Sequence, residues 1–306
     1  MPKTVLGAEQ PTLVQVEGKT LTLKNLEKVY FPESDITKGE LIQYYTEMAP
    51  FILPYIKESP FTMVRYPDGI HGEYFYQKEC PPSAPAWVKR YRDPHSEHGI
   101  NYVVCDHTAT LIYLINLGCI EIHAWASTMA KPEYPAWAVF DLDPDPPSGL
   151  PEAMQVARWL GEILMELKMK FLVKTSGATG IHVLLPLAQN HTYAEVQQGI
   201  GGICRFLAAQ RPAECTLERS TKKREGKVYL DYLQNGRGRT MAGIYSVRPT
   251  PQGHISTPLL WQEVVDRVHP ARFHLRNFRQ RLETVGDLAQ VMHEQNDFRP
   301  ILHYFT

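Results

Sequence analysis

The 306-residue sequence lacks paired cysteines, long apolar runs and a clear net charge. None of its cysteines forms a CxxC pair, which favours buried thiols in a reducing compartment over a disulfide framework or a zinc site. The five cysteines are Cys80, Cys105, Cys119, Cys204 and Cys215. The most apolar stretch, residues 111–120, is too short to span a bilayer, and the N-terminus lacks the apolar core of a signal peptide. We therefore expect a cytoplasmic protein with no membrane partner.

The charge balance excludes a global attraction to nucleic acid or membrane. Lys and Arg number 32 against 33 Asp and Glu, a formal net charge of −1. A nucleic-acid site would need its positive charge gathered locally. The 43% hydrophobic content is that of an ordinary globular protein, and the length allows a substantial core. We expect a flexible tail or edge strand over residues 1–18 and one bilobal domain over residues 19–306.

The spacing of apolar residues predicts a mixture of helices and strands. Helices are expected at 35–56, 108–118, 148–169, 191–210 and 281–294. Strands are expected at 61–66, 119–125, 136–143, 171–176, 180–187 and 227–233. Residues 77–99 are rich in Pro, Lys, Arg and His and indicate an irregular surface segment. This mixture predicts an α+β fold with central sheets flanked by helices, in two lobes.

A strand at 136–143 runs directly into carboxylates. Alternation places Asp141 and Asp143 on one face and Phe140 and Leu142 on the other, and Pro144 ends the strand. Two neighbouring carboxylates repel each other unless a cation lies between them, and hard divalent cations prefer oxygen ligands. A solvated acidic turn is the alternative, because DPDPP is a good turn sequence.

A third carboxylate lies in the predicted strand 227–233. Asp231 is surrounded there by apolar residues, so it must be paired, hydrogen-bonded or metal-bound. The simpler interpretation is a buried Asp paired with Arg224 or Arg237. Three carboxylates from two strands would instead suit a two-metal centre for phosphoryl or nucleotidyl transfer.

Candidate phosphate-binding groups lie between and around these strands. The turn at 176–180, SGATG, offers backbone N–H groups and the Ser176 hydroxyl, and His182 opens the next strand. It lacks the GK[ST] ending of a P-loop, and taken alone it favours a plain hairpin turn with a surface histidine. Basic residues concentrate near Asp231. They could form a clamp for a triphosphate, or they could simply be a solvated basic loop. They are Arg219, Lys222, Lys223, Arg224, Lys227, Arg237, Arg239 and Arg248.

A second basic cluster near the N-terminus could hold a nucleic-acid phosphate. It comprises Lys19, Lys24, Lys28 and Lys38. Tyr74, Phe75 and Tyr76 could stack on a base, although aromatic residues of this kind taken alone favour a core position.

The segments FDLDP, SGxxGxHVxxPL, KVYLDYLQNGRG and YSVRP, in this order, resemble one family. It is the polymerase domain of bacterial DNA ligase D and its stand-alone relatives, in the archaeo-eukaryotic primase superfamily. The resemblance covers residues 20–285 and implies a primase-like fold. It also implies template-directed nucleotidyl transfer, with a preference for NTPs over dNTPs, by a two-metal mechanism using Mn²⁺ or Mg²⁺.

The resemblance also implies roles for individual residues. Metal binding and catalysis fall to Asp141, Asp143 and Asp231. Nucleotide binding falls to His123, Ser176, Thr179, His182, Arg224, Gln234 and Arg248. DNA binding falls to Lys28 and Lys38, which would recognise a recessed 5′-phosphate, and to Arg65, Phe75 and Tyr76 at the template. The family turn usually reads SGxKGxH, so Thr179 replaces a lysine and implies a weakened or relocated phosphate contact. The pair Phe75–Tyr76 replaces the more usual Phe-Phe.

The implied role is primer extension and gap filling in non-homologous end joining. Partners would be DNA ends or gaps with a 5′-phosphate, Ku and a separately encoded ligase, in the cytoplasm at the nucleoid. No ligase or nuclease motif is found, so we expect a polymerase module encoded alone. Alternatives are a non-catalytic DNA-end-binding scaffold, a metal-dependent nucleotide phosphohydrolase, and a primase that starts chains without a primer. Buried carboxylates argue against the scaffold, because a decayed site has no reason to keep them.

Overall fold

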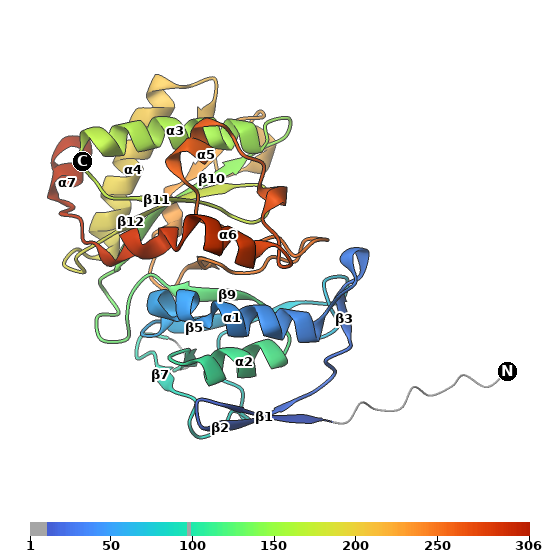
Figure 1. The fold of residues 1–306 in the computed structure, drawn as a ribbon. Coiled ribbons are helices and arrows are strands. Elements are labelled where there is room, and N and C mark those ends of the chain that lie inside the picture. Colours follow the sequence, from blue (N-terminus) through green and yellow to red (C-terminus); the bar gives the residue numbers. More distant parts are fainter. Residues whose placement is uncertain (1–10, 97–98) are drawn as a thin grey trace.

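The computed structural model describes residues 11–96 and 99–306, and the chain forms two lobes, each built on one large sheet (Figure 1). The first lobe holds a 6-stranded antiparallel sheet in the order β15-β9-β5-β8-β7, with β6 paired to β5. Its strands are β5 (Pro60–Arg65), β6 (Phe75–Gln77), β7 (Arg90–Arg92), β8 (Asn101–Val104), β9 (Cys119–Trp125) and β15 (Thr240–Ala242). We expected a flexible tail or edge strand over residues 1–18, and residues 1–10 of this segment lie outside the described residues.

Two helices cover this first sheet. They are α1 (Lys38–Ile56) and α2 (Thr108–Asn116), which contact each other and β9. Helix α1 begins after Thr37 because a capping box forms there: Thr37 Oγ1 accepts from Glu40 N at 3.2 Å, and the Glu40 carboxylate accepts from Thr37 N at 2.9 Å. Two small antiparallel pairs complete the lobe, β1 (Thr12–Val16) with β2 (Lys19–Leu23) and β3 (Val29–Phe31) with β4 (Ile36–Thr37).

The second lobe holds a 5-stranded sheet in the order β11-β12-β10-β14-β13. All its pairs are antiparallel except β13–β14. Its strands are β10 (Trp137–Pro144), β11 (Leu172–Thr175), β12 (Ile181–Pro186), β13 (Cys215–Thr216) and β14 (Val228–Asp231). Its helices are α3 (Leu150–Glu166), α4 (Tyr193–Gln210), α5 (Trp261–Val265), α6 (Phe278–Val285) and α7 (Arg299–Phe305). Short 3₁₀ helices are η1 (Pro32–Ser34), η2 (Thr221–Lys223), η3 (Tyr232–Gln234), η4 (Pro270–Arg272) and η5 (Leu288–His293).

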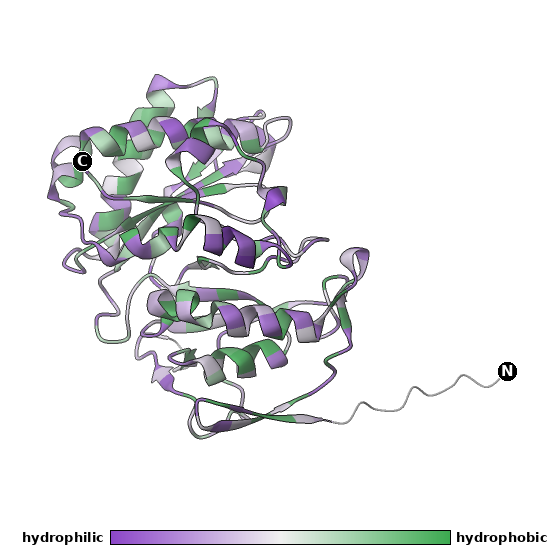
Figure 2. Ribbon diagram, viewed as in Figure 1, coloured by the Kyte–Doolittle hydropathy of each residue, from purple (hydrophilic) through white to green (hydrophobic). Residues whose placement is uncertain are grey.

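Apolar residues lie where helices meet sheets. Figure 2 shows α2 as largely hydrophobic and α6 with a strongly hydrophilic stretch. On β10, Phe140 and Leu142 are fully buried, as the alternating pattern predicted. All five cysteines are buried and free, as expected. Within the described ranges, no helix is both long enough and apolar enough to cross a membrane.

The predicted elements were wrong at two ends that matter. The strand expected over 227–233 stops at Asp231 and turns into η3, so Asp231 ends a strand rather than lying inside one. The helix expected over 281–294 breaks at Gly286, whose φ of 72° is not helical, and the chain continues as η5. In addition, β7 lies within residues 77–99, which were expected to be irregular.

The chain crosses between the lobes next to β14. After η3 it returns to the first lobe, where β15 pairs with β9 through Ala242 opposite His123. A strand from the C-terminal half therefore completes the N-terminal sheet. This crossing places residues from both sheets next to the carboxylate strand β10.

Candidate active site

Strand register brings the central predicted residues into one row. On β10, Asp141 is the partner of Asp231 on β14 and of His182 on β12. His182 is in turn the partner of Lys174 on β11. Four ionisable side chains from four neighbouring strands therefore lie side by side across the sheet. Asp143 follows two residues along on the same face.

The two carboxylates of β10 lack a counter-charge strong enough to offset their burial. Burial raises the pKa of Asp141 to about 6, although the charges of Lys174 and Arg248 oppose the shift. Burial and then the negative charge of Asp141 raise the pKa of Asp143 to about 6. Asp141 Oδ1 is buried and makes no hydrogen bond, although His182 Nε2 lies 3.3 Å away. An unsatisfied oxygen among crowded carboxylates fits a site for a hard divalent cation.

The third carboxylate is held separately. Asp231 Oδ1 accepts hydrogen bonds from the Tyr229 hydroxyl at 3.2 Å and from Leu233 N at 3.1 Å. Hydrogen bonds to residues near it in the sequence therefore hold the Asp231 side chain, and neither Asp141 nor Asp143 contributes to them. Within residues 11–96 and 99–306, no three His, Cys, Asp or Glu side chains form a ready-made ligand set.

The simpler interpretation of Asp231 as the partner of an arginine is wrong. Arg237 makes a bidentate pair with Asp93, at 2.9 and 3.2 Å, and also pairs with Glu133. The Arg224 guanidinium lies over the Tyr229 ring, 4.1 Å from its centre, and Arg224 Nε donates to Glu218 O. Neither guanidinium forms an ion pair with the Asp231 carboxylate.

A buried asparagine, which the sequence did not indicate, fixes this strand end. Asn235 is 6% exposed, its Oδ1 accepts from Val139 N at 2.8 Å, and its Nδ2 donates to Val139 O at 2.7 Å. The amide thus pairs with β10 at the point where β14 has already ended. It holds η3, and with it Asp231, against the strand that carries Asp141.

Lys174 is a second residue that the sequence reasoning missed. It is 1% exposed, and its Nζ lies 2.6 Å from Ser256 Oγ, 3.0 Å from Ala242 O and 2.8 Å from His182 Nδ1. Burial, followed by the nearby Arg248 charge, holds the pKa of Lys174 well below its usual range. The single lysine in the apolar strand FLVKTS could have indicated this role, because a buried ammonium group must have hydrogen-bonding or charged partners.

His182 is buried as well, so the interpretation as a surface histidine on a plain hairpin is wrong. It is 5% exposed, and burial, followed by the charges of Lys174 and Arg248, holds its pKa well below the usual range. A neutral imidazole between Lys174 and Asp141 keeps one N–H to offer as a donor.

The SGATG turn closes tightly against the site. Ser176 Oγ accepts from Ala178 N at 3.1 Å and from Gly180 N at 3.0 Å, so these two amides already have a partner within the turn. A Cβ on Gly180 would come within 2.8 Å of Leu142 O, which shows how closely the turn packs on β10. Thr179, at the lysine position of the family turn, is exposed.

Arg248 and His123 lie beside this turn. Arg248 Nη1 donates to Ser176 O at 2.9 Å, and its Nε lies 2.8 Å from the buried carboxylate of Glu121. His123 on β9 is 5% exposed and contacts the same carboxylate at 3.4 Å. Gln234 is turned away from this group, because its Nε2 donates to Thr240 O at 2.9 Å.

Of the predicted DNA-binding lysines, Lys38 lines a separate basic cavity of the first lobe, of about 540 Å³, and Lys28 does not. Lys24, Lys38 and Arg65 line it together with Tyr30. Lys38 is buried, and its Nζ donates to Lys24 O at 2.7 Å. Burial and then the charges of Lys28, Arg65 and Lys24 lower the pKa of Lys38 to about 8. Lys28 itself pairs with Asp68 and donates to Pro67 O.

The predicted aromatic residues form a surface rather than a core. Phe75 is 44% and Tyr76 is 60% exposed. The Arg65 guanidinium lies 5.2 Å from the centre of the Phe75 ring, and the Tyr76 ring lies edge-on to His123 at 6.1 Å. The aromatic surface therefore runs from the basic cavity to the edge of the candidate active site.

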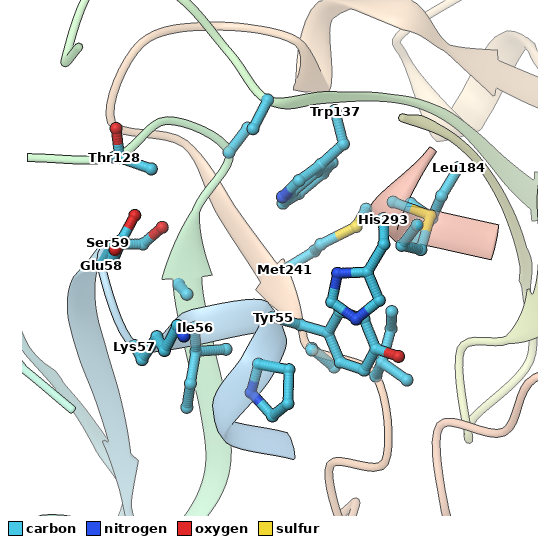
Figure 3. A pocket seen from close by; sticks show the side chains of 18 of the residues that line it. Tyr55, Ile56, Lys57, Glu58, Ser59, Thr128, Trp137, Leu184, Met241 and His293 are labelled. Carbon is cyan, nitrogen blue, oxygen red and sulfur yellow. The ribbon is translucent and has the colours of Figure 1, made fainter. Parts of the chain in front are cut away.

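A further cavity, of about 150 Å³, lies at the lobe junction and is lined by none of the predicted residues (Figure 3). Tyr55 and His293 stack at one wall, with ring centres 5.2 Å apart. Trp137 and Met241 line the same mainly apolar space.

Comparison with known proteins gives a consistent result. Residues 37–289 match the family model described as LigD, primase-polymerase domain. The chain is 34% identical over 267 residues to the bifunctional non-homologous end joining protein LigD of Bacillus subtilis (87% of this chain, 43% of the relative). It is 32% identical over 291 residues to the multifunctional LigD of Pseudomonas aeruginosa (94% of this chain, 34% of the relative). The chain thus spans less than half the length of these relatives.

A solved structure extends the match to the fold. The polymerase domain of Mycobacterium tuberculosis Ligase D in complex with DNA superposes with a TM-score of 0.83 at 27% identity, over 89% of this chain and 97% of that chain. This confirms the predicted α+β, primase-type fold. The chain therefore belongs to the LigD primase-polymerase domain family, which confirms the predicted family and a nucleotidyltransferase of the primase-polymerase type.

Proposed function

We propose that this protein adds nucleotides to a primer 3′-hydroxyl under the direction of a DNA template, filling gaps during non-homologous end joining. The observation that carries the proposal is the strand register that places Asp141 opposite both Asp231 and His182. Carboxylates on one side of His182 and cationic groups on the other suit a triphosphate held against a metal centre.

Asp141, Asp143 and Asp231 would hold the two divalent cations, Mn²⁺ or Mg²⁺. When bound, such cations lower the pKa of an attacking hydroxyl and neutralise charge on a triphosphate. The raised pKa values of Asp141 and Asp143 support this assignment, because a cation would relieve the unfavourable burial of both charges.

The remaining residues would bind and orient substrates. Arg248, which contacts the SGATG turn, and Arg224, whose guanidinium is not committed to Asp231, would neutralise the triphosphate. Ser176 and neutral His182 would donate hydrogen bonds to phosphate oxygens, with Thr179 in the same turn. Gln234 would have to turn from Thr240 O to reach the nucleotide. His123 would lie at the sugar, where a preference for NTPs over dNTPs would be set.

DNA would bind across the first lobe. The basic cavity at Lys38 and Arg65, with Lys28 at its side, would take the 5′-phosphate on the far side of a gap. Phe75 and Tyr76 would stack on the template. Ku and a separately encoded DNA ligase would be the protein partners, at the nucleoid in the cytoplasm. The relatives are named as non-homologous end joining proteins, which supports a role in that process.

Primer extension on a gapped duplex with a downstream 5′-phosphate tests the proposal. NTPs and dNTPs are compared with Mn²⁺ and Mg²⁺, and Asp141→Ala is run beside wild type. We expect templated extension by wild type only, with DNA binding retained in the variant. Extension by Asp141→Ala would remove the metal role. DNA binding without any extension would favour the scaffold, and nucleotide cleavage without a template would favour a phosphohydrolase.

A further inference from the structure

Glu121 is a buried carboxylate to which the proposed reaction assigns no role. It lies on β9, two residues before His123, and is 5% exposed. Its Oε2 lies 2.8 Å from Arg248 Nε and 3.4 Å from His123 Nε2, and its Oε1 accepts from the Tyr66 hydroxyl at 3.2 Å. Three side chains from three different segments therefore converge on one carboxylate.

The carboxylate is charged despite its burial. Burial acts to raise the pKa of Glu121, but the hydrogen bond from His123, the charge of Arg248 and the Tyr66 hydroxyl together lower it. A buried carboxylate costs free energy unless it is paired, so its partners are held firmly. Arg248 is thereby fixed between Glu121 and Ser176 O, with little freedom to turn away from the site.

The same carboxylate faces the exposed aromatic surface. The Tyr66 ring stacks on Tyr74 with ring centres 5.2 Å apart and planes 15° apart. The Tyr74 ring lies edge-on to the Tyr76 ring, with ring centres 6.4 Å apart, and the Tyr76 ring lies edge-on to the His123 ring, with ring centres 6.1 Å apart. Tyr74 is 58% exposed, so a base stacked there would lie one contact from Tyr66 and two from Glu121.

We propose that Glu121 is a positioning residue that fixes Arg248 and His123 for the incoming nucleotide and links them, through Tyr66, to the aromatic surface that meets the template. The inference rests on the proposed polymerase function and adds a component to it. It explains why a carboxylate is placed beside groups that bind an anion, where its charge would otherwise weaken binding. The gain in nucleotide affinity from holding Arg248 in place exceeds the loss in affinity from the negative charge of Glu121.

The link has a measurable consequence. Removing the Glu121 charge frees Arg248 and His123 before the nucleotide arrives, so nucleotide binding must then order them. A buried charge pair contributes a factor of about ten or more to such an equilibrium. We expect Glu121→Gln to raise KM for the nucleotide by about tenfold, with kcat within about twofold of wild type and DNA affinity unchanged.

Steady-state primer extension on a gapped duplex, with thermal unfolding of each variant, tests the inference. Tyr66→Phe removes only the hydroxyl and its bond to Glu121, so a smaller rise in KM is expected. The matched control is Tyr193→Phe, which also loses a buried hydroxyl bonded to a side chain, Ser127, at 2.9 Å. KM should not change in that control. If Glu121→Gln does not fold, Tyr66→Phe decides.

The link to the template surface is tested by a double-mutant cycle. Tyr74→Ala should raise KM for the nucleotide in wild type but have little further effect in Glu121→Gln, because the connection is already broken. An unchanged KM in folded Glu121→Gln or in Tyr66→Phe overturns the positioning role, and additive effects in the cycle overturn the link.

These results are distinguishable from failure of the polymerase proposal. A wild type that extends no primer refutes the proposed function. The Kd for an NTP with Mn²⁺, measured by calorimetry in the same variants, then still tests whether Glu121 holds Arg248. A Kd unaffected by Glu121→Gln would overturn the positioning role, and a weaker Kd would uphold it.

Discussion

The basic cavity predicts that recognition of a 5′-phosphate depends on pH. Lys38 is buried among Lys24, Lys28 and Arg65, and its pKa is lowered to about 8, whereas an ordinary lysine stays charged well above pH 9. Below pH 8 the ammonium is charged and can bind a phosphate directly. Above pH 8 the free protein has lost this proton, so binding must first take it up again, and affinity falls as the pH rises.

The size of the effect follows from the titration. With a pKa of about 8, the protonated fraction of Lys38 falls from about nine-tenths at pH 7 to about one-tenth at pH 9, so its share of the phosphate affinity falls up to about tenfold. A terminal phosphate loses its second proton near pH 6, so its charge changes little in this range. Tyr30, which also lines the cavity, has its pKa raised to about 12 by burial and does not titrate there.

Fluorescence anisotropy with two gapped duplexes, which differ only in the 5′-phosphate, measures this share at each pH. The ratio of the two Kd values cancels every pH effect that does not involve the phosphate. In wild type the preference should fall between pH 7 and pH 9. Lys38→Arg keeps its charge throughout, so its preference should stay constant. A flat ratio in wild type, or an equal fall in Lys38→Arg, would refute the reasoning.

Three further predictions concern single residues. Asn235→Ala leaves the buried N–H and C=O of Val139 without partners, so the free energy of unfolding in urea should fall by about 2–4 kcal/mol and extension should drop; unchanged stability would contradict the assigned role. Thr179→Lys places an exposed cation in the turn at the triphosphate, and KM for NTPs should fall several-fold, whereas an equal or higher KM would show that the phosphate contact is supplied elsewhere. Asp68→Asn releases Lys28, so binding of 5′-phosphorylated gaps should tighten a few-fold at low salt and not at high salt; the same gain in 1 M salt would argue against a charge effect.

The parts of the site that were predictable from sequence are those set by local periodicity. Alternation along β10 placed Asp141 and Asp143 on one face because the opposite face had to be apolar and buried. The start of α1 was readable from Thr37 and Glu40, whose capping box needs only residues three apart. The resemblance to a known family supplied the rest of the residue roles.

The parts that were not predictable depend on contacts far apart in the sequence. Asn235 ends β14 early by bonding to Val139, 96 residues away, and no local pattern announces that bond. Lys174 is accommodated by Ser256, 82 residues away, and by Ala242 of the other sheet. Lone charges within apolar strands mark such positions in a sequence, but they do not identify the partner.

The two charged sites follow one physical logic, although the whole chain is almost neutral. At one site burial raises the pKa values of Asp141 and Asp143, with the charge of Asp141 adding to the shift of Asp143. At the other site burial, followed by the charges of Lys28, Arg65 and Lys24, lowers the pKa of Lys38. The burial of these charges is unfavourable in the free protein and is relieved by a ligand of opposite charge. A metal-bound nucleotide and a 5′-phosphate would be those ligands, and both occur together only at a gap. Binding of one gapped DNA together with its nucleotide would thus relieve the unfavourable burial of charge at both sites. A plain primer end would relieve it at only one, which favours gapped DNA.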